Sequence, residues 1–318
     1  MPPTSSRRGR LLAIATVLAL AVGILLVVWL RPSLPRPQPG LDQPSTLPTI
    51  GARSHAASGS PAPEPKVLLA VGDIGNCEGH ADEAVARLAS RLPGTIALLG
   101  DEAYEHGTAD EYARCFDPAW GPMRSRFRSA PGNHDYLTTD AAGYFSYFGA
   151  AAGRTQKGWY SYELGSWHVV VLNSNCSVVG CDPGSAQVRW LQADLAANRS
   201  ACLLAYWHHP RWSSGRHGST DTVDVFWSEL ASAGADVVLN GHDHTYERIS
   251  VDGVREFVVG TGGRSLYPFT EDPLPGTEVR TDATYGLLWL SLGEGAYDWQ
   301  YVALGRSGFT DAGSGSCS

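Results

Sequence analysis

The stretch "VVLNGHDHTYER", residues 237–248, places two histidines and an aspartate directly after an apolar run. The apolar run has the pattern of a buried strand, and His242 and His244 follow it closely. Side chains at positions i and i+2 of an extended chain point the same way, so both imidazoles can reach one site. A turn needs polar residues, but it does not need histidines. The interpretation therefore depends on whether other strands end in the same way.

Six apolar runs have the length and composition of buried strands. They lie at residues 66–73, 95–101, 168–175, 201–209, 235–244 and 255–263. Three further segments carry apolar residues at steps of three and four, the pattern of a helix with one apolar face, at residues 80–92, 184–198 and 222–234. Residues 285–304 have the pattern of a hairpin that turns at 293–295. The alternation of strands and helices predicts an α/β fold, with antiparallel strands in a second sheet.

Five motifs, most of them directly after a strand, carry residue types that bind metals. They supply Asp73 in "GDIG", Asp101 and Tyr104 in "GDEAY", Asn133, His134 and Asp135 in "GNHD", His208 and His209 in "AYWHH", and the two histidines of "GHDH". Open α/β sheets bind ligands outside the carboxyl ends of their strands, so we expect these side chains to converge. Each motif alone has an ordinary explanation, such as a turn for Gly-Asp or a helix cap for "GNHD". The five motifs together predict a functional site.

In this order, the five motifs resemble those of the calcineurin-like metallophosphoesterases and, within that superfamily, the purple acid phosphatases. The resemblance covers about residues 66–263 and implies a four-layer α/β/β/α sandwich with mixed sheets, in a single catalytic domain assigned to residues 66–318. The chain departs from the pattern at Gly75, where general members carry a metal-binding histidine, and Tyr104 offers a phenolate instead. It also has Ala205 where a valine is usual, at a position that packs rather than binds metal.

The resemblance also implies which residues would hold two metal ions. The first ion would be held by Asp73, Asp101, Tyr104 and His244, and the second by Asp101, Asn133, His208 and His242, with Asp101 bridging. Two carboxylates with a phenolate suit Fe(III), whereas two imidazoles with an amide suit Zn(II), Fe(II) or Mn(II). The predicted cofactor is therefore a binuclear centre of Fe(III) with one of these divalent ions.

The function implied is hydrolysis of small-molecule phosphate monoesters, by in-line attack of a hydroxide held on the metals. His134 is the best candidate for protonating the leaving oxygen or orienting the substrate. His209 and His217 are further candidates for contacts to the substrate. Their ordinary alternatives are a buried supporting role for His209 and a solvated loop position for His217.

Two rival functions remain open at this point. A phosphodiesterase or nucleotide hydrolase would use the same metals, and Tyr136, Trp207, Trp212 and Tyr267 could stack a base or merely pack. A binding protein without catalysis is disfavoured because none of the seven ligands is missing. A dinucleotide-binding oxidoreductase is disfavoured because no G-x-G-x-x-G follows the first strand. Arg248 is expected to be packed or paired rather than a phosphate clamp, and "GTGG" at 260–263 to be a turn rather than an anion-binding loop.

The N-terminal region predicts export. Residues 1–10 are basic and are expected in the cytoplasm, and residues 11–30 are twenty apolar residues without a charge, enough to cross a bilayer. We favour an uncleaved anchor over a cleaved signal sequence, whose apolar region is usually shorter and ends in small residues. Residues 31–65 are rich in Pro, Ser and Gly and predict a tether. The predicted location is the outer face of the cell membrane, or outside the cell if the segment is cleaved.

Charge and cysteines agree with an exported enzyme. The chain carries a net charge of −8, and residues 54–318 hold 18 basic and 31 acidic residues, which argues against nucleic acid as a partner. All six cysteines follow the tether, and an even number in an exported chain predicts disulfides. Cys176 with Cys181 is the likeliest pair, and Cys317 could join Cys202 and leave Cys77 with Cys115. The alternative is that some thiols are free and buried.

Overall fold

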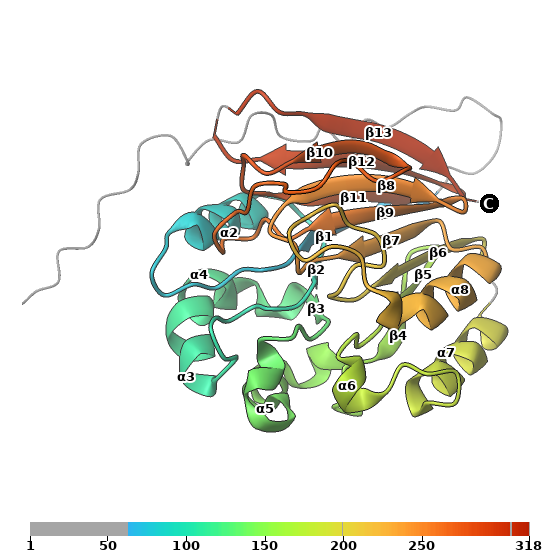
Figure 1. Ribbon diagram of the computed structural model, residues 1–318, viewed down its shortest axis with the longest axis horizontal. Coiled ribbons are helices and arrows are strands. Elements are labelled where there is room, and N and C mark those ends of the chain that lie inside the picture. The colour runs from blue at the N-terminus through green and yellow to red at the C-terminus, as the bar shows by residue number, and fades with distance from the viewer. Residues whose placement is uncertain (1–62, 199, 306, 318) are drawn as a thin grey trace, which may run out of the picture. The chain divides into compact units, whose positions relative to one another are not determined.

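Two β-sheets form the centre of the fold in the computed structural model, which describes residues 63–318 except 199, 306 and 318 (Figure 1). One sheet has the order β13 (Asp311–Ser316), β12 (Ala296–Ala303), β11 (Gly286–Gly293), β1 (Lys66–Val71), β2 (Thr95–Leu98) and β3 (Phe127–Ser129). Strands β1, β2 and β3 are parallel to one another, and the β11–β13 side is antiparallel. This sheet is therefore mixed.

The second sheet is also mixed. Its order is β10 (Thr277–Thr281), β8 (Tyr246–Val251), β9 (Val254–Val259), β7 (Val237–Asn240), β6 (Cys202–Tyr206), β5 (Trp167–Val171) and β4 (Tyr160–Leu164). The central pairs β5–β6, β6–β7 and β7–β9 are parallel, and the remaining pairs are antiparallel. Strands β3 and β4 are the edge strands of their sheets, each at the end of its order.

Helices cover the outer face of each sheet. The α-helices are α2 (Ala81–Arg91), α3 (Ala109–Glu111), α4 (Asp117–Trp120), α5 (Ala142–Phe148), α6 (Cys176–Val179), α7 (Ala186–Ala197) and α8 (Asp224–Ser232). Short 3-10 and π segments are η1 (Tyr112–Phe116), η2 (Gly121–Arg126), η3 (Asp135–Leu137), η4 (Thr139–Ala141), η5 (Gly149–Ala152) and η6 (Asp221–Val223). In Figure 1, α2, α3 and α4 lie on one side of the strands and α7 and α8 on the other.

The alternation of side chains along β1 shows how the layers pack. Leu69 and Val71 belong to a hydrophobic cluster with residues of α2, whereas Leu68 and Ala70 belong to the cluster between the two sheets. Successive side chains of a strand point to opposite faces, so a strand that is apolar throughout is buried on both. A third cluster lies between the second sheet and helices α7 and α8. The four-layer α/β/β/α sandwich in a single domain is therefore confirmed.

The six predicted strands, the three predicted helices and the hairpin are all present, and the strands are shorter at their carboxyl ends than predicted. The residues past those ends leave the sheet. Strands β3, β4, β8, β10 and β13 were not predicted. Strand β13, with the sequence "DAGSGS", carries no apolar pattern and is held by pairing with β12. Its existence depends on tertiary contacts rather than on local sequence.

Three disulfides join Cys77 to Cys115, Cys176 to Cys181 and Cys202 to Cys317. The predicted pairing is confirmed and no cysteine is free. The last bridge ties β6 of one sheet to the segment after β13 of the other.

The predicted basic N-terminus (1–10), the apolar segment (11–30) and residues 31–62 of the tether lie outside the described residues. Within the part of the chain that the structure describes, no helix is long and apolar enough to cross a membrane.

Candidate metal centre

The residues predicted for the first metal lie around the phenol oxygen of Tyr104. Its hydroxyl donates to Oδ1 of Asp73 over 2.8 Å, and its oxygen lies 3.2 Å from Oδ2 of Asp101. Nε2 of His244 lies 3.2 Å from the same phenol oxygen and 3.4 Å from Oδ1 of Asp73. The four residues follow β1, β2 and β7, so the two sheets contribute to one place.

The other predicted ligands gather around His208. Its Nε2 lies 3.0 Å from Oδ1 of Asn133 and 3.3 Å from Nδ1 of His242. The same nitrogen lies 3.2 Å from Oδ2 of Asp101. This Asp101 oxygen is also 3.2 Å from the phenol oxygen of Tyr104. One carboxylate therefore lies between two sets of donor atoms.

Three residues of the site hold a backbone conformation that is uncommon for residues other than glycine. Asp73, Asp101 and His242 have φ angles of 60°, 55° and 71°. Residues in such sparsely populated regions cost on the order of 1–3 kcal/mol each and persist only where the surrounding structure holds them. All three lie where the chain leaves β1, β2 and β7. Three residues that converge on this site thus hold strained backbone conformations.

The glycine of "GHDH" allows the chain to pass close to Asp73. A Cβ at Gly241 would lie 2.7 Å from Oδ2 of Asp73 and 3.2 Å from Nδ1 of His208. The next backbone N–H, that of His242, donates to the same Asp73 oxygen over 2.8 Å. This close approach is what brings the loop after β7 against the end of β1.

Backbone carbonyls orient two of the imidazoles. Nδ1 of His208 lies 2.8 Å from the carbonyl oxygen of Leu99, and Nδ1 of His244 lies 2.7 Å from that of Ser265. A carbonyl oxygen can only accept, so Nδ1 carries the proton in each ring. Nε2 is then the atom of each ring that would bind a metal, once any proton on it is lost, and both Nε2 atoms face the carboxylates of the site. Metal-binding histidines are held in this way.

The chemistry of the donor set fits a pair of cations. Asp73 and Asp101 are buried, with 0% and 1% of their surfaces exposed, and among the described residues their ion pairs are with histidines. Burial opposes ionisation of Asp101, but the charge of His208 and its hydrogen bond lower the pKa of this carboxyl overall. Burial and the two carboxylates raise the pKa of Tyr104 well above its usual value, so a phenolate here needs a cation of high charge beside it.

The departure at Gly75 has a steric cause. Gly75 forms a parallel bridge with Ala103, and its N–H donates to the carbonyl oxygen of Glu102 over 2.8 Å. A Cβ at this position would lie 2.5 Å from that carbonyl oxygen. The N–H of Tyr104 donates back to the Gly75 carbonyl over 2.8 Å, and the phenol then reaches Asp73. The backbone pairing that excludes a side chain at position 75 thus positions the phenol.

His134 lies at the border of the cluster, with 27% of its side chain exposed. Its backbone N–H donates to Oδ1 of Asp101 over 2.8 Å, and its Nδ1 lies 2.6 Å from the carbonyl oxygen of Glu105. Nδ1 therefore carries a proton, and Nε2 lies 4.0 Å from Oδ2 of Asp101. The ring can exchange a proton through Nε2 with a group bound beside the cluster.

His209 and His217 both lie against His242, and in each pair the ring centroids are 4.5 Å apart. Nδ1 of His209 lies 2.8 Å from the hydroxyl oxygen of Ser174. Burial and the charge of His208 lower the pKa of His209 to about 3, so this ring is neutral. Nitrogen atoms of His208, His209 and His242 lie close enough together to share one metal ion. His209 is therefore a candidate ligand as well as a candidate substrate contact.

Asp243, between the two histidines of "GHDH", has a role that sequence reasoning missed. Its carboxylate accepts hydrogen bonds from the backbone N–H of His217 over 2.7 Å and from the hydroxyl of Ser213 over 2.6 Å. Asp243 therefore holds the loop that brings His217 to the site. The only sequence signal was its position between two candidate ligands.

Two further residues at the cluster come from the loop after β9. The ring of Tyr267 stacks on His244, with centroids 4.2 Å apart and planes inclined by 13°. The guanidinium of Arg264 lies 5.0 Å from the centroid of the Tyr104 ring and pairs with Glu105. Tyr267 was among the aromatic residues considered for the site. Arg264 was not, because nothing in its local sequence distinguishes it.

Other residues weighed in the sequence analysis have structural roles. Arg248 pairs with Asp311 through two hydrogen bonds of 2.8 and 2.9 Å. Trp207 is fully buried in the cluster between the second sheet and its helices. The N–H groups of Gly260 and Gly262 donate to backbone carbonyl oxygens, so "GTGG" does not present them to an anion. The expectations of a paired arginine and a plain turn are confirmed.

A two-sheet sandwich with carboxylate, phenol, imidazole and amide groups at one end defines the class of the protein as a metallophosphoesterase fold. The chain belongs to the calcineurin-like phosphoesterase family, whose model matches residues 66–246.

Relatives by sequence are acid phosphatases. Over 249 residues the chain is 28% identical to purple acid phosphatase 15 of Arabidopsis thaliana, an alignment that covers 64% of this chain and 46% of that protein. Over 283 residues it is 25% identical to acid phosphatase type 7 of Homo sapiens, covering 72% of this chain and 62% of that protein. The chain thus spans about half the length of the relatives it matches.

Solved structures share the fold. The purple acid phosphatase PPD1 from yellow lupin seeds superimposes with a TM-score of 0.67 at 17% identity, covering 80% of this chain and 55% of that one. GAP50, described as the anchor in the inner membrane complex of Plasmodium, superimposes with a TM-score of 0.61 at 12% identity, covering 78% and 88%. Because proteins with such different descriptions share this fold, only the residues of the site can indicate an activity.

Proposed function

We propose that this protein is a binuclear metal-dependent phosphatase that hydrolyses small-molecule phosphate monoesters. The observation that carries the proposal is the position of Asp101, whose Oδ2 lies 3.2 Å from both Tyr104 Oη and His208 Nε2. A carboxylate between an anionic oxygen-rich set and an imidazole-rich set is placed to bridge two different metal ions. The similarity to acid phosphatases supports the same function.

Asp73, Asp101, Tyr104 and His244 would hold Fe(III), and Asp101, Asn133, His208 and His242 would hold Zn(II), Fe(II) or Mn(II). When bound, a metal pair supplies Lewis acidity for the phosphoryl oxygens and activates water for in-line displacement. The chain would hold the ions with donor atoms fixed in advance, because His208 and His244 are oriented by the carbonyls of Leu99 and Ser265.

His134 would protonate the leaving oxygen of the ester. Its Nδ1 proton is used by the Glu105 carbonyl, which leaves Nε2 as the atom that gives up a proton. The ring borders the donor set of Tyr104, with centroids 4.5 Å apart, and part of it is exposed to an entering substrate. An alkoxide is a poor leaving group without a proton, so this transfer lowers the barrier.

His217 would orient the phosphoryl group. Its ring lies 4.5 Å from His242 and 5.8 Å from Tyr267, measured between centroids. The Asp243 carboxylate accepts a hydrogen bond from the backbone N–H of His217 and so holds the loop. The imidazole of His217 can therefore exchange its hydrogen-bond partners without a movement of the loop. His209 would support the His242 ring or contact the same phosphoryl group.

The test measures metal content and substrate class together. The full-length protein, purified without chelator, is analysed for iron, zinc and manganese and assayed on p-nitrophenyl phosphate and on bis(p-nitrophenyl) phosphate. We expect about two metals per chain and faster hydrolysis of the monoester. Faster hydrolysis of the diester would replace the monoesterase assignment with a phosphodiesterase. Folded protein that stays without metal after metal is supplied would overturn the mechanism and favour a binding protein.

We also propose that the protein is exported. Three disulfides support this, because such bonds persist in oxidising compartments. Cell fractionation of a C-terminally tagged chain would test it, with tagged protein that remains in the cytoplasm contradicting export. The mass of the exported product distinguishes an uncleaved anchor from a cleaved signal sequence.

A further inference from the structure

A cavity of about 690 Å³ lies away from the metal centre and shares no lining residue with it. It opens beside the edge strands of both sheets, since Phe127 and Arg128 of β3 and Tyr160 to Tyr162 of β4 line it. Its volume is in the range of small-molecule sites, roughly 300–1,000 Å³. Helix α7 contributes Trp190, and the loop between η5 and β4 contributes Arg154 and Lys157.

The charge of the lining is entirely positive. Arg124 already has partners within the protein, because it pairs with Asp117 and its guanidinium lies 3.9 Å from the centroid of the Tyr147 ring. Among the residues that the structure describes, Arg128, Arg154 and Lys157 have no carboxylate within 4.0 Å.

Three unpaired cations around one cavity are unusual in a chain whose residues 54–318 carry 31 acidic groups against 18 basic ones. One guanidinium N–H of Arg128 donates to the Phe127 carbonyl over 2.8 Å, so the other N–H groups can donate to a ligand. A cavity lined by one sign of charge concentrates ligands of the opposite sign. The cavity therefore favours an anionic ligand.

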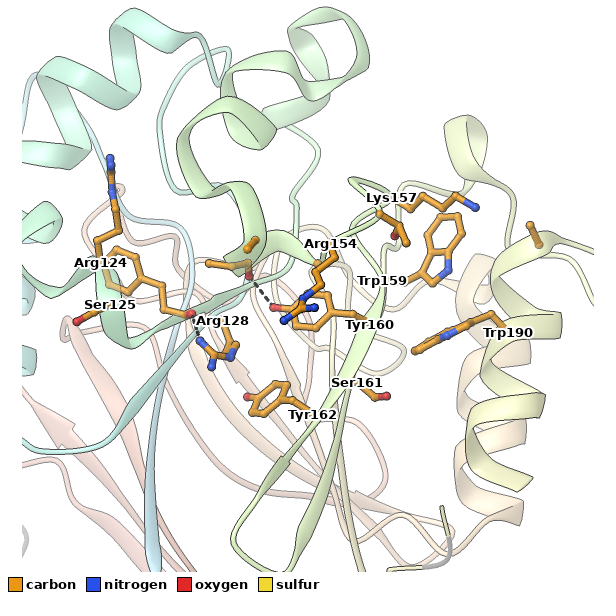
Figure 2. A pocket seen from close by; sticks show the side chains of 16 residues that line it. Arg124, Ser125, Arg128, Arg154, Lys157, Trp159, Tyr160, Ser161, Tyr162 and Trp190 are labelled. Carbon is orange, nitrogen blue, oxygen red and sulfur yellow. Dashed lines mark hydrogen bonds between the residues drawn. The ribbon is translucent and has the colours of Figure 1, made fainter. Parts of the chain in front are cut away.

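The lining is also aromatic, and its two tryptophans lie apart from Arg124 and Arg128. Figure 2 shows Arg124 and Arg128 on one side, Trp159 and Trp190 on the other, and Arg154 between them. The ammonium of Lys157 lies 5.4 Å from the centroid of the Trp159 ring. Indole rings provide a surface on which a flat base can stack. None of the described residues that line the cavity is Asp, Glu, Asn or Gln, the types that bind sugar hydroxyls most readily.

We propose that this cavity binds a nucleotide, with the base against Trp159 and Trp190 and the phosphates toward Arg128 and Arg154. A ligand of this class has a flat ring at one end and two or more negative charges at the other, which matches the two ends of the cavity. The site does not depend on the metal centre, so the proposal stands or falls separately from phosphatase activity.

The test titrates the full-length, metal-loaded protein with adenosine 5′-(α,β-methylene)diphosphate, whose terminal phosphate resists hydrolysis. Isothermal titration calorimetry should show a binding event besides any at the metals, and this event should persist in Asp101→Asn. Replacing charge-assisted contacts in the double variant Arg128→Gln, Arg154→Gln should weaken it by about tenfold or more. Trp190→Ala should weaken it several-fold, which is the order expected for loss of base stacking.

The matched control is Arg114→Gln, which removes an exposed arginine that pairs with Asp110 outside the cavity. This variant should bind the probe as the unchanged protein does. All cavity variants should hydrolyse p-nitrophenyl phosphate at the unchanged rate. Binding that disappears in a folded Asp101→Asn variant, or that the cavity substitutions leave unchanged, would overturn the proposal. Inorganic pyrophosphate binding as tightly as the probe would overturn the assignment of a base-binding end.

A second measurement needs no substitution, in case Asp101→Asn does not fold. The unchanged protein is photolysed with 8-azidoadenosine 5′-(α,β-methylene)diphosphate, whose terminal phosphate resists hydrolysis, and the labelled peptides are mapped by mass spectrometry. Label in the peptides of Trp159 or Trp190 supports the site. Label confined to peptides that carry His217 or Tyr267 would place all nucleotide binding at the metal centre and contradict the proposal.

Discussion

The phenol oxygen of Tyr104 lies 2.8 Å from Oδ1 of Asp73, although 31 residues separate them in the chain. The contact exists because the segment after β1 pairs with the segment after β2, through the bridge between Gly75 and Ala103. Tyr104 is therefore held by the same backbone pairing that leaves no room for a side chain at position 75.

Tyr104→Phe should give a folded protein with less iron and without visible colour. A phenolate bound to Fe(III) absorbs visible light, and loss of its oxygen removes both that absorption and one anionic donor. Iron content and the visible spectrum are measured on protein loaded under identical conditions. Tyr267→Phe is the control, because it keeps the ring on His244 and should keep the colour. Unchanged colour in Tyr104→Phe would remove this residue from the metal site.

Gly75→Ala should destabilise the fold by about 1–3 kcal/mol, as overpacking does. The added Cβ would lie 2.5 Å from the Glu102 carbonyl, and the strand end that carries Asp101 and Tyr104 would have to move. Urea unfolding reports stability, and metal content should fall with it. Gly79→Ala is the matched control, because its nearest neighbouring atom would be 3.5 Å away. Equal free energies of unfolding for Gly75→Ala and Gly79→Ala would contradict the prediction and show that the backbone at position 75 shifts at little cost.

His134→Ala should lower kcat on alkyl phosphates by roughly 10²–10⁴-fold, the usual contribution of a general acid. Metal content should change little, because the side chain of His134 is not among the proposed ligands. Esters whose leaving group is a weak base need no proton, so p-nitrophenyl phosphate should be affected least. The measurement compares kcat across phosphate esters of increasing leaving-group pKa. Equal loss on all esters, accompanied by loss of metal, would instead make His134 a structural residue or a ligand.

Asp82→Asn should remove a pH dependence of stability between about pH 4 and pH 7. Asp82 is 2% exposed, its Oδ1 has no hydrogen-bond partner within the described chain, and burial raises its pKa from 3.8 to about 7. The folded protein therefore keeps this proton up to about pH 7, whereas the unfolded chain loses it near pH 3.8. Stability contributed by the neutral group is full below pH 3.8 and falls as the pH rises, by up to about 4 kcal/mol at roughly 1.4 kcal/mol per pKa unit.

The check is the free energy of unfolding of the unchanged protein and of Asp82→Asn, measured with urea near pH 4.5 and pH 7.5. From pH 4.5 to pH 7.5 the free energy of unfolding of Asp82→Asn should rise relative to that of the unchanged protein. Asp272→Asn, at an exposed position, should show no such gain. A constant difference between Asp82→Asn and the unchanged protein at both pH values would contradict the raised pKa.

The sequence predicted much of the fold because period and length are local properties. Runs such as 235–244 are apolar enough to be strands without reference to anything else, and β7 lies inside that run. Strand β4, "YSYEL", escaped prediction although it alternates apolar and polar residues, because it is only five residues long. Strand β13, "DAGSGS", carries no apolar pattern. Each is held by backbone pairing with a strand near it in the chain, β4 with β5 and β13 with β12.

At the site, too, some features follow from the local sequence and others only from the packing of distant segments. Residue types and their order determined, from the sequence alone, which side chains could meet at the ends of the strands. Through the family resemblance, they also implied that Asp101 would bridge the two ligand sets. The sequence did not indicate that Asp243 holds the loop of His217 or that Arg264 lies over Tyr104. Nor did it indicate the cationic cavity, whose residues come from η2, β3, η5, β4, α7 and the loop between η5 and β4. A motif is a property of neighbouring residues, whereas a contact depends on how separate strands and loops pack, and only the tertiary structure decided those contacts.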